Sequence, residues 1–530
     1  MPTVRNPEEI QSNRHFSVPD RPEVWRLASW ALTGVLVLLL VGLVAKSAFS
    51  AATSAQMWAY PFQFDESEGM IVAETMLLDQ GVPIFDVPGP DLFISAPYPP
   101  LFYLLALPGQ HLAGSEPTFK VGRTISILAT IFVGVAIFGI VVALTRDRLA
   151  GAIGAAAWWS LGVVTFWGSL VKPDMTAVAL GFAGLWWLLA KPERQAWWAL
   201  LFFLAAFYTK QTAIAAAAAG IFWLLVMRPR MGLGFLGAYA LGAFVPSAIL
   251  TWMTDGGYYY HQGTFELPGL PSPVHDLPWM ADRFALYVSN FATTYAVFLV
   301  PGMVALLLVG LRSLWVRVSQ RSARLDTLHR GAILLLAHLG MSVFVSIGTG
   351  TLGGNHNHLL DWAAAGGLGL GMAAGLTRRA EYLGVRVAAV GVALVVVLAL
   401  PSLFSNPAWL ERSFRPMHPE IAGEMHKIFQ YVTNNGGPAY SDNVGLLLTT
   451  GKRLWTTDPY TQTHATQYGR WDESKLVAEI RRKGFAQVIL RINIFDPNPG
   501  AGDVSPGILQ ALRDNYKLDQ RNVENIYVPR

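Results

Sequence analysis

The chain has 530 residues, of which 53% are hydrophobic and only 14% are charged, whereas about 25% of the residues of an average soluble domain are charged. This composition excludes an ordinary soluble enzyme, because a soluble core cannot contain so much apolar sequence. The net charge of +4 does not indicate a nucleic-acid-binding surface, and the absence of cysteine excludes disulfides, thiolate metal sites and cysteine nucleophiles.

The apolar sequence divides into runs of the length that crosses a bilayer. A membrane-spanning helix needs about 20 apolar residues, and runs of this kind predict eleven spans, although the three between 175 and 227 are short. The runs lie near 27–49, 119–144, 149–168, 175–190, 196–209, 211–227, 231–253, 286–311, 331–348, 359–376 and 386–404. The expected fold class is therefore an all-α polytopic membrane protein with about 11 transmembrane helices.

The predicted orientation depends on the segment Pro99–Ala113. It is short and contains Pro108, so it suits a half-embedded helix on the outer side better than a full span. The connections that then become cytoplasmic hold most of the loop Lys and Arg, as the positive-inside bias requires. They are Arg146–Arg148, Lys191–Arg194, Arg228–Arg230, Arg312–Arg330 and Arg378–Arg386.

This orientation divides the chain into three parts. Residues 1–26 form a cytoplasmic tail, and residues 27–404 form the transmembrane domain with a large first outer loop at 50–118. Residues 405–530 are richer in charge and turn signals. They contain a helical stretch, Asp472–Lys483, that leads into a strand-like run, Ala486–Ile492. We expect a small extracytoplasmic α/β domain there.

Polar residues recur at the outer ends of the predicted spans, where such groups are costly and tend to be functional. Carboxylates act as general bases or hold a divalent cation, and lysines bind phosphate as point charges. In chain order, the segments that carry these groups are Asp65–Glu66, Tyr98–Leu101, Lys172–Asp174, Thr209–Gln211 and Gly353–His358.

The carboxylates and lysines also have plainer explanations. Asp65 and Glu66 suit the N-terminus of the helix expected over Met70–Leu78, where negative charge is stabilised by the helix dipole. Asp174 suits a helix cap, and an isolated lysine at a span end usually extends its ammonium to the interface.

The histidines leave two alternatives open. His356 and His358 lie two residues apart near Asp361, a spacing compatible with a divalent metal. Histidine pairs more often make ordinary hydrogen bonds. No cofactor is therefore certain, and a divalent cation is one possibility.

The ordered set of motifs resembles the GT-C superfamily of integral membrane glycosyltransferases, specifically its family 39-like branch. That branch is similar to protein O-mannosyltransferases and to the lipid A aminoarabinose transferase. The resemblance covers roughly residues 27–376 and rests on Asp65–Glu66, Tyr98–Leu101, Lys172–Asp174, Thr209–Gln211 and Gly353–Asn357.

The resemblance implies transfer of a sugar from a polyprenyl-phosphate donor to an acceptor hydroxyl on the outer side, with inversion. Asp65 would be the base that deprotonates the acceptor, with Glu66 and Asp174 as further catalytic carboxylates. Further residues would bind the substrates. Lys210, Lys172 and Arg123 would bind the donor phosphate, and Tyr98, Asn355, His356 and His358 would contact substrate.

The hypothesis that follows is a hexosyl- or pentosyltransferase of a bacterial plasma membrane. Its partners would be membrane lipids, the lipid-linked donor and a glycan, lipid or protein acceptor. The alternative is a non-catalytic subunit or lipid-binding scaffold of a larger membrane complex. A secondary transporter is disfavoured, because it would need interrupted helices and an inverted repeat, whereas the sequence shows neither and its polar residues cluster at one face.

Overall fold

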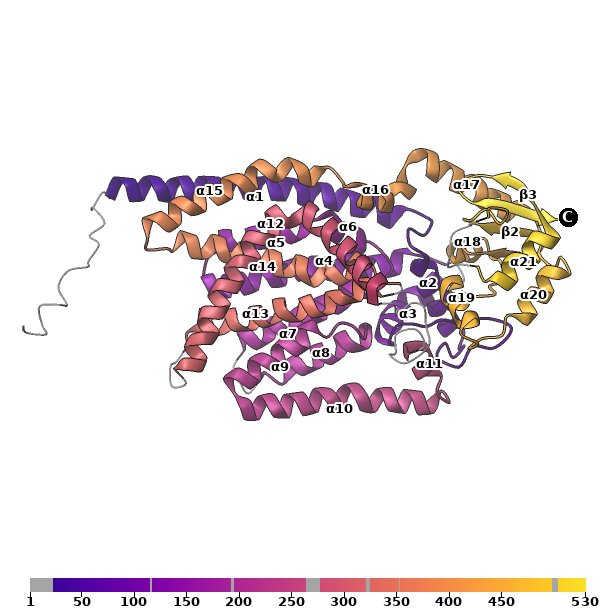
Figure 1. Cartoon of the computed structure of the whole chain (residues 1–530), viewed down its shortest axis with the longest axis horizontal. Coiled ribbons are helices and arrows are strands. Elements are labelled where there is room, and N and C mark those ends of the chain that lie inside the picture. The colour runs from indigo at the N-terminus through magenta and orange to yellow at the C-terminus, as the bar shows by residue number, and fades with distance from the viewer. Residues whose placement is uncertain are drawn as a thin grey trace, which may run out of the picture.

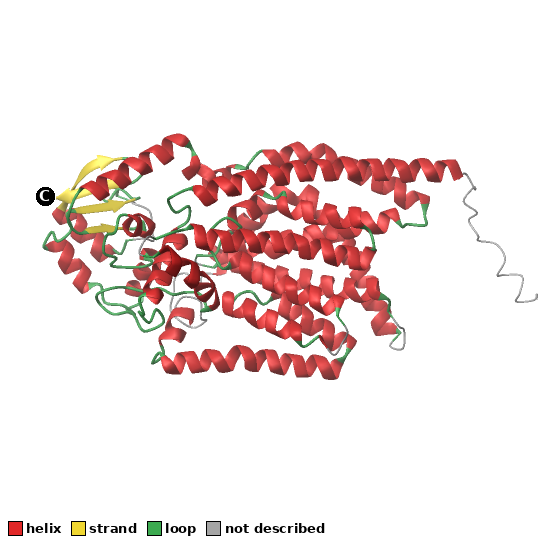
Figure 2. Cartoon of the chain, turned by 180° about the vertical axis from the view of Figure 1, so that it is seen from behind, coloured by secondary structure: helices red, strands yellow, loops and turns green. Residues whose placement is uncertain are grey.

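A computed structural model describes residues 22–114, 117–191, 195–263, 277–320, 325–351, 353–497 and 504–530. Most of the expected N-terminal tail therefore lies outside the described residues. Helices run side by side along the long axis of the molecule, and the small sheet lies at the end opposite the N-terminal end of α1 (Figure 1). The strands are confined to that end (Figure 2).

Within the described residues, seven helical segments have the length and apolar composition needed to cross a membrane. They contain α1 (Pro22–Ala59), α4 (Lys120–Thr145), α10 (Pro229–Met253), α12 (Leu277–Ser319), α13 (Thr327–Ser346), α14 (Leu360–Arg378) and α15 (Leu383–Ala399). Three shorter apolar helices accompany them: α7 (Asp174–Ala190), α8 (Trp198–Thr209) and α9 (Ala215–Met227). The predicted class, a mostly helical membrane protein, is thus confirmed, and each of the predicted apolar runs coincides with helical structure. Eleven spans were predicted, whereas seven segments of the described residues are long enough to span.

One predicted span is divided. The run at 149–168 forms α5 (Arg148–Trp159) and α6 (Gly162–Trp167), because Leu161 has an extended backbone between them. The N–H of Val163, which has no helical partner in this first turn of α6, donates to the hydroxyl of Tyr295 at 3.0 Å. A side chain of α12 therefore stabilises the break, and the local sequence does not reveal it.

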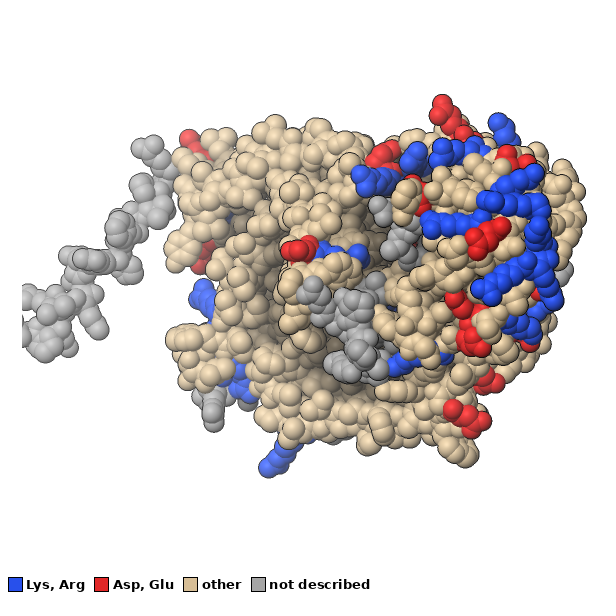
Figure 3. Space-filling view, turned by 45° about the vertical axis from the view of Figure 1, so that its right-hand side comes forward, with Lys and Arg blue, Asp and Glu red and all other residues tan. Residues whose placement is uncertain are grey.

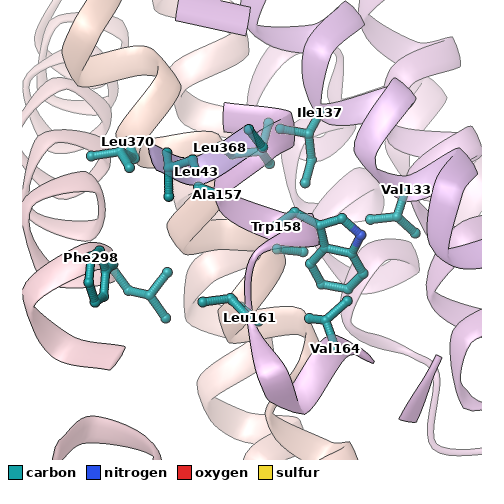
Figure 4. Close-up of a cluster of buried hydrophobic side chains, with 14 of the residues drawn as sticks. Leu43, Val133, Ile137, Ala157, Trp158, Leu161, Val164, Phe298, Leu368 and Leu370 are labelled. Carbon is teal, nitrogen blue, oxygen red and sulfur yellow. The ribbon is translucent and has the colours of Figure 1, made fainter. Parts of the chain in front are cut away.

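Small residues bring the central helices close together. A Cβ on Gly369 of α14 would lie 2.3 Å from the carbonyl oxygen of Gly302 of α12, so the two backbones are in contact there. Trp158 is fully buried nearby, among apolar side chains of several helices (Figure 4). Its indole N–H donates to the carbonyl of Thr130 at 3.0 Å. The glycine-rich tract at 366–375 thus permits close packing of α14 against its neighbours.

The first loop contains α2 (Glu66–Asp79) and α3 (Leu101–Ala113). As expected, α3 is a 13-residue helix with Pro108 inside it, too short to span. Its side chains Leu104, Leu105 and Leu112 are 50%, 46% and 87% exposed, which suits a helix lying against lipid.

The C-terminal segment forms a small α/β structure, as predicted. Its sheet has the order β1-β2-β4-β3, with β1 parallel to β2 and the other pairs antiparallel. The strands are β1 (Ala439–Ser441), β2 (Gln487–Leu490), β3 (Tyr516–Arg521) and β4 (Asn525–Pro529). The helices here are α16 (Ala408–Phe414), α17 (Pro419–Asn434), α18 (Val444–Thr449), α19 (Pro459–Gln467), α20 (Ser474–Arg481) and α21 (Pro506–Asn515). The remaining short helix, α11 (Gly257–Gly263), is not part of this segment and follows α10. Charged side chains gather over this part, whereas the helical part is mostly uncharged on the face shown (Figure 3).

The first loop is bonded to this C-terminal structure through the main chain. Phe93 forms a parallel β-bridge with Thr456. The N–H of Phe93 donates to the carbonyl of Trp455 at 3.0 Å, and the carbonyl of Phe93 accepts from the N–H of Thr457 at 2.8 Å. The indole N–H of Trp471 donates to the carbonyl of Gly89 at 3.0 Å. These bonds fix the C-terminal structure against the loop that carries Asp65.

Candidate active site

A cavity of about 470 Å³ lies between the ends of the helices and the C-terminal structure. Its wall contains almost all of the polar segments that the sequence analysis selected. The predicted residues that line it are Asp65, Glu66, Tyr98, Lys172, Lys210, Asn355 and His358. Asp174 is buried directly behind this wall, in contact with Lys210.

Asp65 combines a structural contact with an ion pair. It is the N-cap of α2, where its carboxylate accepts from the N–H of Ser67 at 3.1 Å and from the Ser67 hydroxyl. The same Oδ1 lies 3.0 Å from Nζ of Lys172. Burial alone would raise the pKa of Asp65, but Lys172 and the hydrogen bonds from Ser67 outweigh it and lower the pKa below its usual value.

A second ion pair joins Asp174 and Lys210. Nζ of Lys210 lies 2.5 Å from Oδ1 of Asp174, which also accepts from the side-chain amide of Asn357 at 2.7 Å. The other oxygen, Oδ2, is buried and has no hydrogen-bond partner among the residues that the structure describes. Asp174 is the first residue of α7 and Pro173 is its N-cap, so the capping alternative for Asp174 is wrong.

Arg123 does not reach the cavity, and the phosphate-binding role that we predicted for it is incorrect. Its side chain is fully buried and forms a two-pronged ion pair with Glu68, 2.9 Å for each contact. Its remaining N–H groups donate to the carbonyls of Met57, Tyr60 and Phe62. All five guanidinium donors thus have protein partners, and none remains for a ligand.

His356 is also absent from the cavity wall. Its ring stacks on Trp409 with centroids 3.9 Å apart and meets the edge of Tyr287 at 4.6 Å. Asp361 pairs with His338 at 3.1 Å instead of approaching either predicted histidine. Within the described ranges no cluster of His, Asp and Glu side chains fits a metal ion, so we assign no divalent cation to His356 and His358.

Glu66 connects the cavity to the C-terminal structure. Its carboxylate forms an ion pair with Arg491, whose guanidinium also lies 3.3 Å from the buried carboxylate of Asp442. Tyr98 lies on the adjoining segment, and burial raises the pKa of its hydroxyl above the usual range. Gln211 stabilises the same segment, because its side-chain amide donates to the carbonyl of Pro97, the residue before Tyr98, at 3.1 Å.

Several residues of the cavity wall were not predicted. Arg283 and Tyr287 come from α12. Tyr460, Thr461 and His464 come from α19, and Asp458 is the N-cap of that helix. Nη2 of Arg283 donates to the carbonyl of Gly354 at 2.9 Å, and among the described residues Arg283 pairs with no carboxylate. Arg283 could have been selected from the sequence, because it is a charged residue at a predicted span end. The residues of α19 could not, because α19 reaches the cavity only through the docking of the C-terminal structure.

Glu74 is a buried carboxylate that holds three segments beside the cavity together. It accepts from the N–H of Ala96 at 2.8 Å, the Tyr103 hydroxyl at 2.7 Å and the Thr457 hydroxyl at 2.8 Å. Ala96 has a positive φ of 35°, which is strained for a residue with a side chain and is stabilised here by the Glu74 contact. Burial raises the pKa of Glu74 to about 7, although these hydrogen bonds favour the ionised form.

This raised pKa predicts a pH-dependent stability. The folded protein keeps a proton on Glu74 that the unfolded chain releases above its usual value of 4.5, so the contribution is complete below that value and is lost as the pH rises through about 7. We expect thermal unfolding temperatures measured between pH 5 and 8 to fall less steeply for Glu74→Gln than for the wild type. Glu420→Gln, which neutralises an exposed carboxylate on α17, should keep the wild-type slope; an unchanged slope for Glu74→Gln would contradict the assignment.

The chain thus combines apolar helices long enough to cross a membrane, short loop helices and a terminal α/β structure. No family model and no curated protein matches the sequence. The structure is similar to ArnT from Cupriavidus metallidurans bound to undecaprenyl phosphate, with a TM-score of 0.54 and 12% identity over 91% of this chain and 97% of that chain. For ArnT in the apo state the TM-score is 0.50 and the identity 14%, with the same coverage. The predicted GT-C type of fold is confirmed.

Proposed function

We propose that this protein transfers a sugar from a polyprenyl-phosphate donor to an acceptor hydroxyl. The observation that carries the proposal is the composition of the cavity wall, where a carboxylate pair and three cations, Lys172, Lys210 and Arg283, surround one space. The GT-C fold supports it, since the similar ArnT structure holds undecaprenyl phosphate. A phosphate that leaves with an added negative charge requires cations of this kind.

Asp65 is the residue best placed to act as the base. It lies at the cavity wall with its side chain 27% exposed, so an acceptor hydroxyl can reach the carboxylate. Asp174 is 3% exposed and already accepts two hydrogen bonds through one oxygen, so it serves better to orient Lys210 and Asn357. Glu66 would orient the acceptor from the side of Arg491.

The reaction would proceed by a single displacement with inversion. The acceptor oxygen attacks the anomeric carbon while its proton passes to Asp65, and the electron pair of the broken bond remains on the phosphate oxygen. Arg283, Lys172 and Lys210 would neutralise the leaving phosphate. Tyr98, Asn355 and His358 line the same cavity and would contact the sugar or acceptor.

We further propose that the cavity faces the outside of a bacterial plasma membrane. The charged connections support this orientation: Arg378 at the end of α14 lies 2.6 Å from Asp147 at the start of α5, so two of the basic connections are neighbours. The N-terminal end of α1 and the sheet lie at opposite ends of the molecule (Figure 1). In this proposal residues 27–404 form the transmembrane domain and residues 405–530 the extracytoplasmic domain.

The test is transfer of a radiolabelled sugar from a sugar-linked undecaprenyl phosphate donor by the purified full-length protein, with membrane extracts as the source of acceptor. Release of undecaprenyl phosphate together with a labelled product supports an enzyme. Absence of turnover with hexose and pentose donors, combined with stable co-purifying subunits, would favour the scaffold alternative instead.

A further inference from the structure

Lys172 occupies the position between the proposed base and the space for the donor. It lies in the turn before α7, is 8% exposed, and lines the cavity. Its ammonium lies 3.0 Å from Asp65 and 4.7 Å from the centroid of the Trp167 ring. The ion pair is therefore a part of the cavity wall, where a bound phosphate can compete with Asp65 for the same ammonium group.

This pairing conflicts with catalysis if it persists. A carboxylate held by an ammonium group has a lowered pKa and is a weaker base. The titratable groups that interact with this pair are Tyr98, Asp174 and His358, and Tyr98 in turn interacts with Asp458. Among the described residues no second cation pairs with Asp65, so the carboxylate becomes free only when Lys172 changes its partner.

We propose that Lys172 exchanges partners during the reaction: it holds Asp65 in the empty site and pairs with the phosphate of the lipid donor once that donor is bound. The inference rests on the proposed function and adds an order in which the two substrates bind. The donor must bind first, because Asp65 becomes an effective base only when Lys172 has left it.

The charges of the reaction fit this exchange. A sugar-linked polyprenyl phosphate is a diester with one negative charge, and the released polyprenyl phosphate is a monoester that approaches two. The acceptor proton passes to Asp65, which becomes neutral, while the electron pair of the broken bond adds negative charge to the phosphate. Negative charge thus moves from one partner of Lys172 to the other, and the total charge of the site stays constant.

Lys210 is less suited to this role. Its partner Asp174 keeps a second donor, the amide of Asn357, and is almost completely buried. Separation of that pair would leave a buried carboxylate with a single hydrogen bond, which is costly. Asp65, by contrast, is more exposed and keeps its bonds from Ser67 when Lys172 leaves.

The experiment measures the affinity of the full-length protein for undecaprenyl phosphate, the product of the proposed reaction. It compares the wild type with Asp65→Asn, Lys172→Gln and the double variant in detergent, each checked for an unchanged thermal unfolding temperature. Lys120→Gln is the matched control, because Lys120 is on the same side of the molecule but lies over the Trp58 ring, outside the cavity.

Exchange predicts that Asp65→Asn binds about tenfold more tightly than the wild type, because Lys172 no longer has an internal partner. Lys172→Gln should bind about tenfold more weakly, and adding Asp65→Asn to it should restore little. The Lys120→Gln control should bind as the wild type does.

Three results would overturn the inference. If Asp65→Asn leaves the affinity unchanged or lowers it, the pair does not compete with the phosphate. If Asp65→Asn tightens binding equally in the Lys172→Gln background, simple charge repulsion explains the gain. If the wild type binds no undecaprenyl phosphate, the proposed function itself fails, and the exchange fails with it.

Discussion

Replacing Asp65 with asparagine is expected to lower the turnover of sugar transfer by about a hundred- to ten-thousandfold, the range that a positioned general base contributes. The amide has nearly the same shape and still accepts hydrogen bonds from Ser67 at the start of α2, but it cannot take the acceptor proton. Radiolabelled product formed at saturating donor is the measurement. The expected loss is in kcat, since the variant is expected to bind the lipid phosphate at least as well as the wild type.

Asp79→Asn is the matched control for this prediction. It removes a carboxylate from the same helix, α2, where Asp79 pairs with the exposed His111 at 2.9 Å and takes no part in the cavity. Turnover of this control should stay near the wild-type value. A folded Asp65→Asn variant that retains wild-type kcat would remove Asp65 from the mechanism.

Replacing Arg123 with methionine is expected to lower the free energy of unfolding by about 3 to 5 kcal/mol, because removal of one partner leaves an uncompensated buried charge on Glu68. Three backbone carbonyls at the end of α1, those of Met57, Tyr60 and Phe62, would lose their donors as well. Thermal or denaturant unfolding in detergent measures the loss.

Arg123→Met should also lower the turnover, because it disturbs the positions of Asp65 and Lys172. Glu68 accepts from the N–H of Phe64 at 2.7 Å and from the N–H of Val171 at 2.9 Å, the residues next to Asp65 and Lys172. The buried pair therefore fixes the distance between the proposed base and its ammonium partner. Glu68 and Arg123 are positioning residues, and Arg123→Lys should recover part of the turnover.

A second ion pair provides the comparison for the loss of stability. Arg378 pairs with Asp147 at 2.6 Å, and the Arg378 side chain is 31% exposed. Arg378→Met should cost no more than about 1 kcal/mol, as expected for a partly solvated pair. Equal losses for the two variants would show that the burial of Arg123 does not control the stability.

The hydrophobic pattern was sufficient to predict the helical membrane architecture. A run of about 20 apolar residues is a local property that lipid or a helical core must cover wherever it lies, so the spans were readable from the chain alone. The break in the run at 149–168 was not readable, because it depends on the hydroxyl of Tyr295 from a distant helix. The short helix over Leu101–Ala113 was predicted correctly from its length and from Pro108.

The sequence by itself determined the class of fold and most of the polar segments that meet at the cavity, since both depend on residue type and order along the chain. Only the tertiary structure decided which of those residues face the cavity. Arg123 has the charge of a phosphate ligand, but its buried partners use every donor. The ring of His356 stacks on Trp409 instead of lining the cavity. The helix α19 reaches the wall because the segment before it is bonded to Phe93. A side chain's charge is local, whereas its hydrogen-bond partners come from segments that are distant in sequence.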